Sequence, residues 1–143
     1  MLRDSLTYTL ASIADGAIRD ATRLFRERFG WDVYEIRVLR AIRDNPGATF
    51  TDIAALTRAE RSATSRILER LVKAGLVRRQ SSREDARRYL LTLTAAGEAI
   101  CRDADPLTAE LEGLMLEPLS PQDRKTLLEA VQTVLVWVNG GYR

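Results

Sequence analysis

Residues 49–94 constrain the fold most strongly, because they predict two capped helices and a hairpin in close succession. A weak capping box at residues 49–52 opens a short helix that extends to Leu56. A second box follows at once in "TRAE", residues 57–60, and predicts a longer helix over 58–74. A short helix, a brief turn and a freshly capped longer helix indicate a helix-turn-helix.

The pattern changes after Gly75, which stops the second helix. The stretches "LVRRQ" and "RYLLTL" favour strands, and they flank the polar, turn-like stretch "SSREDA". We therefore expect a hairpin whose tip projects Arg83, Glu84, Asp85 and Arg87. A helix-turn-helix followed directly by a basic hairpin predicts a winged helix.

Amphipathic helices are predicted on both sides of the winged helix. Residues 5–29 carry apolar side chains at steps of three and four, and "DVYE" is a capping box that starts a further helix through about Arg43. The pattern is helical again from Ala95, although Pro106 should kink or locally break that helix. "SPQD" then places a serine cap and a first-turn proline before the last helix.

A small winged helix cannot easily bury the apolar stripes of both the first and the last helix. We therefore expect these two helices to pack together across the twofold axis of a homodimer. The predicted fold class is mostly α with a small β-hairpin wing. It comprises a winged helix-turn-helix at residues 31–94, with N- and C-terminal dimerisation helices in residues 1–30 and 95–143. The last stripe consists of Leu127, Leu128, Val131, Val134, Leu135 and Val138.

The composition disfavours several classes of protein. The chain has no histidine, the commonest general base and zinc ligand, and it has no phosphate-binding glycine loop or nucleophile motif. Its single cysteine, Cys101, can form neither an intrachain disulfide nor a metal cluster. We expect no enzymatic activity, no cofactor and no metal. No stretch approaches the about 20 apolar residues of a bilayer-crossing helix, and no secretory signal is present, so we expect a cytoplasmic protein.

Positive charge is concentrated between Thr57 and Thr94. This segment holds ten basic and four acidic residues, a net charge of +6 in a chain whose total is +2. Clustered Lys and Arg bind duplex DNA by releasing the counterions condensed on its phosphates. A solvated, arginine-rich surface is the alternative, but it explains poorly why acidic residues become scarce here while basic residues persist.

The predicted second helix of the helix-turn-helix carries a polar face that suits DNA. Four residues at helical spacing form this face: Arg58, Arg61, Ser62 and Ser65. The arginines could bond bidentately to guanine in the major groove, and the serines could contact bases or phosphates. The basic hairpin tip could reach the neighbouring minor groove.

The stretch "ATSRILERLVKAGLVRR", followed by "EDARRYLLTLTAAG", resembles the MarR family of transcription regulators. The matching features are Arg66 in the recognition helix, the Leu-x-x-x-Gly-Leu-Val type of ending from Leu71 to Val77, and the Asp-x-Arg…Leu-Thr…Gly wing from Asp85 to Gly97. The resemblance implies a homodimeric winged-helix repressor or activator that binds a pseudo-palindromic operator in double-stranded DNA.

The resemblance also implies roles for single residues. Asp85 would brace nearby arginines, and Arg87 would enter the minor groove; the alternative for Asp85 is a hairpin-turn acid without a partner. Arg66 and Arg70 lie off the base-reading face, so we expect them to contact phosphate or to brace the wing.

Many members of the MarR family respond to small aromatic or phenolic compounds. By resemblance, Tyr8, Trp31 and Tyr34 would line such an effector cleft, although aromatic residues near helix starts are more often packing residues. A peroxide-sensing branch uses a cysteine near the N-terminus, which this chain lacks, and Cys101 is expected to be a buried apolar residue. Two further readings stay open: a winged-helix protein-interaction module and a non-specific DNA-coating protein.

Overall fold

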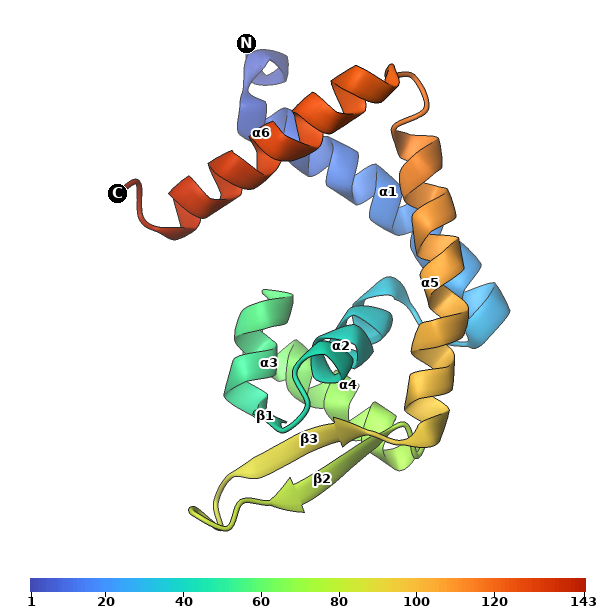
Figure 1. Ribbon diagram of the computed structural model, residues 1–143, viewed down its shortest axis with the longest axis vertical. Coiled ribbons are helices and arrows are strands. Elements are labelled where there is room, and N and C mark those ends of the chain that lie inside the picture. The colour runs from blue at the N-terminus through green and yellow to red at the C-terminus, as the bar shows by residue number, and fades with distance from the viewer. The chain divides into compact units, whose positions relative to one another are not determined.

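The computed structural model of the protein describes residues 1–143, which form two compact units, Met1–Thr108 and Ala109–Arg143. The first unit begins with a short 3-10 helix, η1 (Leu2–Asp4), and the long helix α1 (Leu6–Phe29) (Figure 1). The expected helix at residues 5–29 is thereby confirmed.

The junction between α1 and the next helix follows the sequence prediction closely. Gly30 ends α1 with a φ of +74°, a left-handed conformation that costs glycine little. Asp32 then caps α2 (Val33–Asp44) through a complete capping box. The Asp32 carboxylate accepts the backbone N–H of Glu35 at 2.9 Å, and the Glu35 carboxylate accepts the backbone N–H of Asp32 at 2.9 Å.

A helix-turn-helix follows, as the sequence predicts. Its first helix is α3 (Phe50–Thr57), capped by a reciprocal pair of hydrogen bonds between Thr49 and Asp52. Its second helix, α4 (Arg61–Lys73), is the predicted recognition helix.

The predicted start of α4 at residue 58 is wrong, and "TRAE" is not a capping box. Thr57 is the last residue of α3, and its hydroxyl donates to the Ile53 carbonyl at 2.9 Å. Arg58 ends α3 in the left-handed region, at a φ of +56°, so it cannot also belong to the first turn of α4. Glu60 occupies the N-cap position of α4 without a side-chain hydrogen bond.

The wing is a three-stranded antiparallel sheet of order β1-β3-β2. β2 (Val77–Ser81) and β3 (Tyr89–Leu93) form the predicted hairpin, in a register that pairs Val77 with Leu93. The sequence did not predict β1 (Ala48–Thr49), a two-residue strand that joins the turn before α3 to β3. β1 therefore ties the base of the wing to the helix-turn-helix.

The core of the first unit lies where α2 contacts α3, α4 and β3. On α4, Thr64, Leu68 and Leu71 are buried in this core, whereas Ile67 is only half-buried. The side chains buried most completely are Ile36, Val38, Leu39, Ile42, Ile53, Thr64, Leu71 and Cys101.

The helix after the wing, α5 (Ala95–Met115), runs without interruption through Pro106. The expected local break is absent: proline removes one backbone donor from α5, and Leu107 and Ala104 on either side of it are buried in the first unit. Packing of these neighbours compensates for the lost hydrogen bond.

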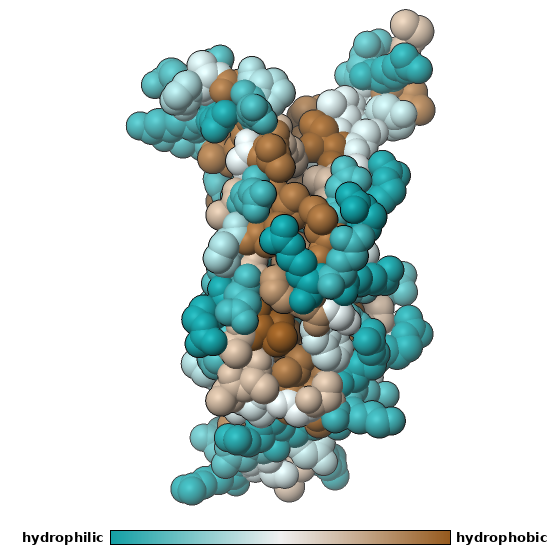
Figure 2. All heavy atoms as spheres, turned by 90° about the vertical axis from the view of Figure 1, so that its right-hand side faces the viewer, coloured by the Kyte–Doolittle hydropathy of each residue, from teal (hydrophilic) through white to brown (hydrophobic).

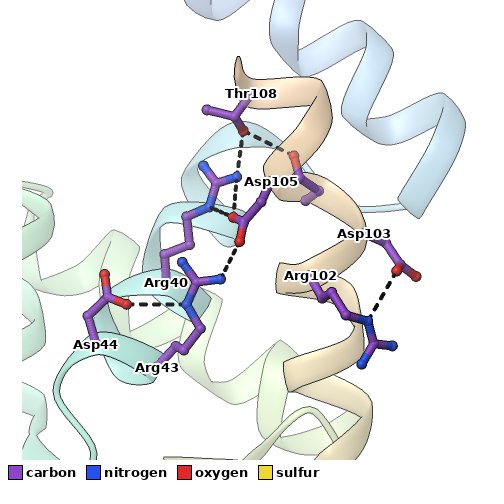
Figure 3. Close-up of polar contacts among 8 residues, drawn as sticks. Arg40, Arg43, Asp44, Arg102, Asp103, Asp105 and Thr108 are labelled. Carbon is purple, nitrogen blue, oxygen red and sulfur yellow. Dashed lines mark hydrogen bonds and ion pairs between the residues drawn. The ribbon is translucent and has the colours of Figure 1, made fainter. Parts of the chain in front are cut away.

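Asp105, next to this proline, is the centre of a polar cluster between α2 and α5 (Figure 3). Its carboxylate accepts the Arg40 Nε at 3.1 Å and the Arg43 Nη1 at 2.7 Å. Arg40 also donates to the Thr108 hydroxyl. The hydrogen bond to Asp105 raises the pKa of the Arg43 guanidinium.

The second unit contains α6 (Pro121–Asn139), which begins as predicted. The Ser120 hydroxyl accepts the N–H of Asp123 at 3.1 Å, and Pro121 occupies the first turn. Every residue of the predicted apolar stripe on α6 is exposed, from 39% at Leu135 to 46% at Leu128. Figure 2 shows apolar side chains reaching the surface of the chain between polar ones. No helix in the structure is both long and apolar enough to span a membrane.

Candidate nucleic-acid interface

The outward face of α4 carries three of the four side chains predicted to read bases. Arg61 and Ser62 are exposed in its first turn, and Ser65 is half-exposed one turn later. Thr64 and Leu68 turn inward to the core. A polar N-terminal face on a helix anchored by its apolar face can enter the major groove without exposing the core.

Arg58 does not share this helical face, contrary to the sequence-based expectation. It lies in the turn before α4 with its backbone N–H bonded to the Ala54 carbonyl at 3.1 Å. Its side chain therefore starts from the loop between the two helices, where phosphate contact fits better than base reading.

Arg61 is held by an aromatic neighbour on α3. Its guanidinium carbon lies 5.2 Å from the ring centroid of Phe50, the first residue of that helix. A cation over an aromatic face is attracted to the ring quadrupole. Phe50 thus restricts the conformations of Arg61, although no motif in the sequence pointed to Phe50.

The two remaining arginines of α4 have different surroundings. Arg66 is exposed. Arg70 instead forms an ion pair with the buried Glu35 of α2 and places its guanidinium carbon 5.0 Å from the centroid of the Trp31 ring. The contacts of Arg70 are therefore with α2 and with Trp31, and its predicted roles, phosphate contact or bracing of the wing, stay predictions.

The hairpin tip exposes the predicted wing residues Arg83, Asp85 and Arg87. The Asp85 carboxylate accepts the backbone N–H of Arg87 at 3.0 Å, so it orders the turn through a backbone group rather than a guanidinium. The contact of Asp85 in this structure is therefore with the backbone of Arg87, and its predicted bracing of arginine side chains stays a prediction.

Three further arginines of the wing were not among the DNA-binding residues predicted from the sequence. Arg78 and Arg79 project from β2, where every residue after Val77 is exposed. Arg88 lies at the end of the hairpin loop. The pKa of the Asp52 carboxyl is lowered chiefly by the hydrogen bond from the Thr49 backbone, and the positive charge of Arg88 lowers it further. The net charge of +6 between Thr57 and Thr94 is the sequence feature that could have pointed to these three arginines as DNA-binding residues.

One chain does not bring the three predicted effector residues together. Tyr8 lies near the start of α1, whereas Trp31 follows its end, a separation of roughly 30 Å along the helix. Tyr34 is 46% exposed, with the Arg37 guanidinium 5.8 Å from its ring. An open hollow of about 610 Å³ lies elsewhere, lined by the turn after α2 and by α3.

Cys101 lies on the buried side of α5, as expected. The residue is fully buried, and this burial raises the pKa of its thiol. The thiol is therefore held in its neutral form, which is a weak nucleophile.

Comparison with known proteins places these features in a family. The sequence profile of the MarR family matches residues 32–88. The Transcriptional regulator HosA of Escherichia coli O157:H7 is 30% identical over 98 residues, which cover 68% of this chain and 73% of HosA. The chain belongs to the MarR family. The HTH-type transcriptional regulator BilQ of Clostridium symbiosum is 31% identical over 87 residues, covering 61% of this chain and 60% of BilQ.

Solved structures of MarR proteins share the fold. A mutant MarR from Escherichia coli complexed with operator DNA superimposes with a TM-score of 0.81 at 24% identity, covering 91% of this chain and 93% of that one. The predicted winged-helix fold class is thus confirmed over most of the chain. The aligned region takes in both the winged helix-turn-helix and flanking helices.

Proposed function

We propose that this protein is a sequence-specific DNA-binding transcriptional regulator that acts as a homodimeric repressor on a pseudo-palindromic operator. The observation that carries this proposal is the polar outer face of α4, with Arg61, Ser62 and Ser65 on it, beside a wing rich in arginine. Membership in a family whose relatives are named transcriptional regulators supports it. The proposed function agrees with the expected cytoplasmic location.

The homodimer is supported by the unburied apolar faces at both ends of the chain. On α1, Leu6, Leu10 and Ile13 are 63%, 43% and 51% exposed. The stripe on α6 is exposed along its whole length. Apolar area of this kind, arranged as a helical stripe rather than as scattered residues, marks a protein interface.

The two-fold symmetry of such a dimer determines the spacing of the DNA half-sites that it would bind. Two recognition helices related by a dimer axis contact half-sites about one helical turn, or roughly 10 bp, apart. If the arginines of both protomers make six to ten phosphate contacts, the affinity falls by about 10³–10⁵ between 50 and 200 mM salt.

Release by a small aromatic or phenolic effector belongs to the same proposal. It is supported by the family, and by the position of Trp31 beneath the guanidinium of Arg70, which belongs to α4. A ligand at Trp31 would act next to the recognition helix. We expect at least one compound from a set of benzoates, phenols and hydroxypyridine acids to release the operator complex; release by none of them would contradict this part.

The Arg61→Ala variant tests the base-reading role. Because a good bidentate contact discriminates by about 1–3 kcal/mol, we expect operator affinity to fall by that amount for each half-site, and selectivity to relax at one base pair of each half-site. The matched control is Arg102→Ala, an exposed arginine of α5 outside the basic segment. An unchanged base preference in Arg61→Ala would overturn the assignment.

A further inference from the structure

Glu35 is a buried carboxylate with two distinct partners. Its side chain is 4% exposed. One oxygen, Oε2, completes the capping box of α2 by accepting the Asp32 N–H, and the other, Oε1, is paired with the Arg70 guanidinium. An ionised carboxylate at such a site requires a countercharge, because desolvation is costly for an unpaired charge.

The countercharge comes from the recognition helix. Arg70 lies in the last turn of α4, and its guanidinium is held between the carboxylate of Glu35 and the ring of Trp31. Two different interactions, one ionic and one with a ring face, thus fix the C-terminal end of α4 against the N-terminal end of α2. We call Glu35, Arg70 and Trp31 the α2–α4 clamp.

The clamp and the base-reading residues lie at opposite ends of one rigid element. Arg61 precedes Arg70 by nine positions, which separates them by roughly 13 Å along the helix axis. A helix held at its last turn and packed on the core by Leu68 and Leu71 can present its first turn in only one orientation. A small rotation at the clamp moves the side chains of the first turn relative to the base edges.

We propose that Arg70 is a positioning residue for sequence recognition, acting through Glu35 and Trp31, and not a phosphate ligand. This inference rests on the proposed function, because it concerns how α4 reads an operator. It assigns Glu35 and Trp31 to the same task, although neither lies on the DNA-binding face of α4. The side chain of Arg70 is 60% exposed, so the competing role, a phosphate contact, makes a distinct experimental prediction.

The two roles predict opposite effects of Glu35→Gln. Glutamine keeps the carbonyl that can cap α2 but loses the negative charge, and so releases Arg70. If Arg70 positions α4, operator affinity falls by roughly 5- to 150-fold, the loss for one mismatched base pair, while affinity for scrambled duplex is unchanged. If Arg70 binds phosphate, its release strengthens binding to both duplexes.

The Arg70→Met variant supplies the second comparison. For a positioning residue, we expect a similar loss on the operator and an unchanged slope of log affinity against log salt. A phosphate ligand would lower both affinities and reduce the slope by about 1.8, because the variant dimer loses one contact of about 0.9 in each protomer. Arg66→Met, which removes an exposed arginine one turn earlier on α4, is the matched control, and the slope should fall for that variant if Arg66 contacts phosphate.

The double variant Glu35→Gln/Arg70→Met covers the case in which a single variant fails to fold. It leaves no unpaired buried charge, so it should fold, and it should lose operator selectivity no further than either single variant. All variants are titrated by fluorescence polarisation with the duplex selected by the wild-type protein and with its scrambled form, at several salt concentrations.

The outcomes separate this inference from the proposed function. Failure of the wild-type protein to select any duplex would overturn both. A selected operator that the double variant binds with wild-type affinity and selectivity would overturn the positioning role alone. Equal losses on operator and scrambled duplex, with a smaller salt slope, would make Arg70 a phosphate ligand.

Discussion

Replacing Gly97 by alanine tests the packing between the wing and α5. Gly97 is buried in the first turn of α5. A Cβ added there would lie 2.2 Å from the carbonyl oxygen of Leu76, a backbone atom that no rotamer change can move. The same carbonyl accepts the backbone N–H of Thr94 at 3.0 Å, so moving it also strains the junction between β3 and α5.

The size of the effect follows from three contributions. Overpacking against a fixed group costs about 1–3 kcal/mol. Loss of the Thr94 hydrogen bond costs roughly 1 kcal/mol, and the higher helix propensity of alanine returns about the same amount. We therefore expect Gly97→Ala to lower the free energy of unfolding by about 1–3 kcal/mol.

Gly113→Ala is the matched control on the same helix. A Cβ at Gly113 meets no atom within 4 Å, so this variant should gain roughly 0.5–1 kcal/mol of stability. Both are measured by urea unfolding at one protein concentration, because a dimer gains stability with concentration. Gly97→Ala at wild-type stability, or a shift of the same sign and size in both variants, would refute the close contact with Leu76.

Three further variants or probes test separate parts of the structure. Arg58 adopts a left-handed conformation that costs residues other than glycine about 1–2 kcal/mol. Arg58→Gly should therefore stabilise the protein by up to that amount while weakening DNA binding. Reduced stability in thermal unfolding would contradict the turn geometry. Asp105→Asn removes the carboxylate that Arg40 and Arg43 share, although Arg43 keeps its ion pair with Asp44, and it should cost about 1–2 kcal/mol. Asp103→Asn, in an exposed pair with Arg102, should cost almost nothing. Equal urea midpoints for the two variants would argue against the cluster in Figure 3. Cys101 is fully buried, so a thiol reagent should label it only when the fold opens, and labelling should be far slower than for the urea-unfolded protein. Rapid labelling of the native protein at neutral pH would show that the thiol is accessible.

Local rules predicted the parts of the fold that local contacts determine. The capping boxes at Asp32 and Thr49 and the serine cap at Ser120 are confirmed, because each consists of hydrogen bonds within four residues. The hairpin was predictable from its two short β-favouring stretches and the polar, turn-like stretch between them. "TRAE" carried the same signature and failed, because Arg58 adopts a left-handed conformation and separates Thr57 from α4.

Contacts between distant parts of the sequence were beyond such rules. The pairing of β1 with β3 joins residues that lie more than 40 positions apart, Ala48 with Leu91. The ion pair between Glu35 and Arg70 spans 35 positions. The sequence assigned Arg70 to DNA or the wing because it showed an unpaired arginine in a basic segment, and only the tertiary structure provides its partner.

The most direct measurement of the proposed function is selection of bound duplexes from a random DNA library by the purified protein, followed by titration at two salt concentrations. We expect an enriched inverted repeat with half-sites about 10 bp apart, bound by one dimer at least roughly 10³-fold more tightly than its scrambled form. Tight, salt-sensitive binding to every duplex without enrichment would contradict the regulator and favour a DNA-coating protein. No binding to any duplex would contradict it as well, and would assign the basic face to a protein partner.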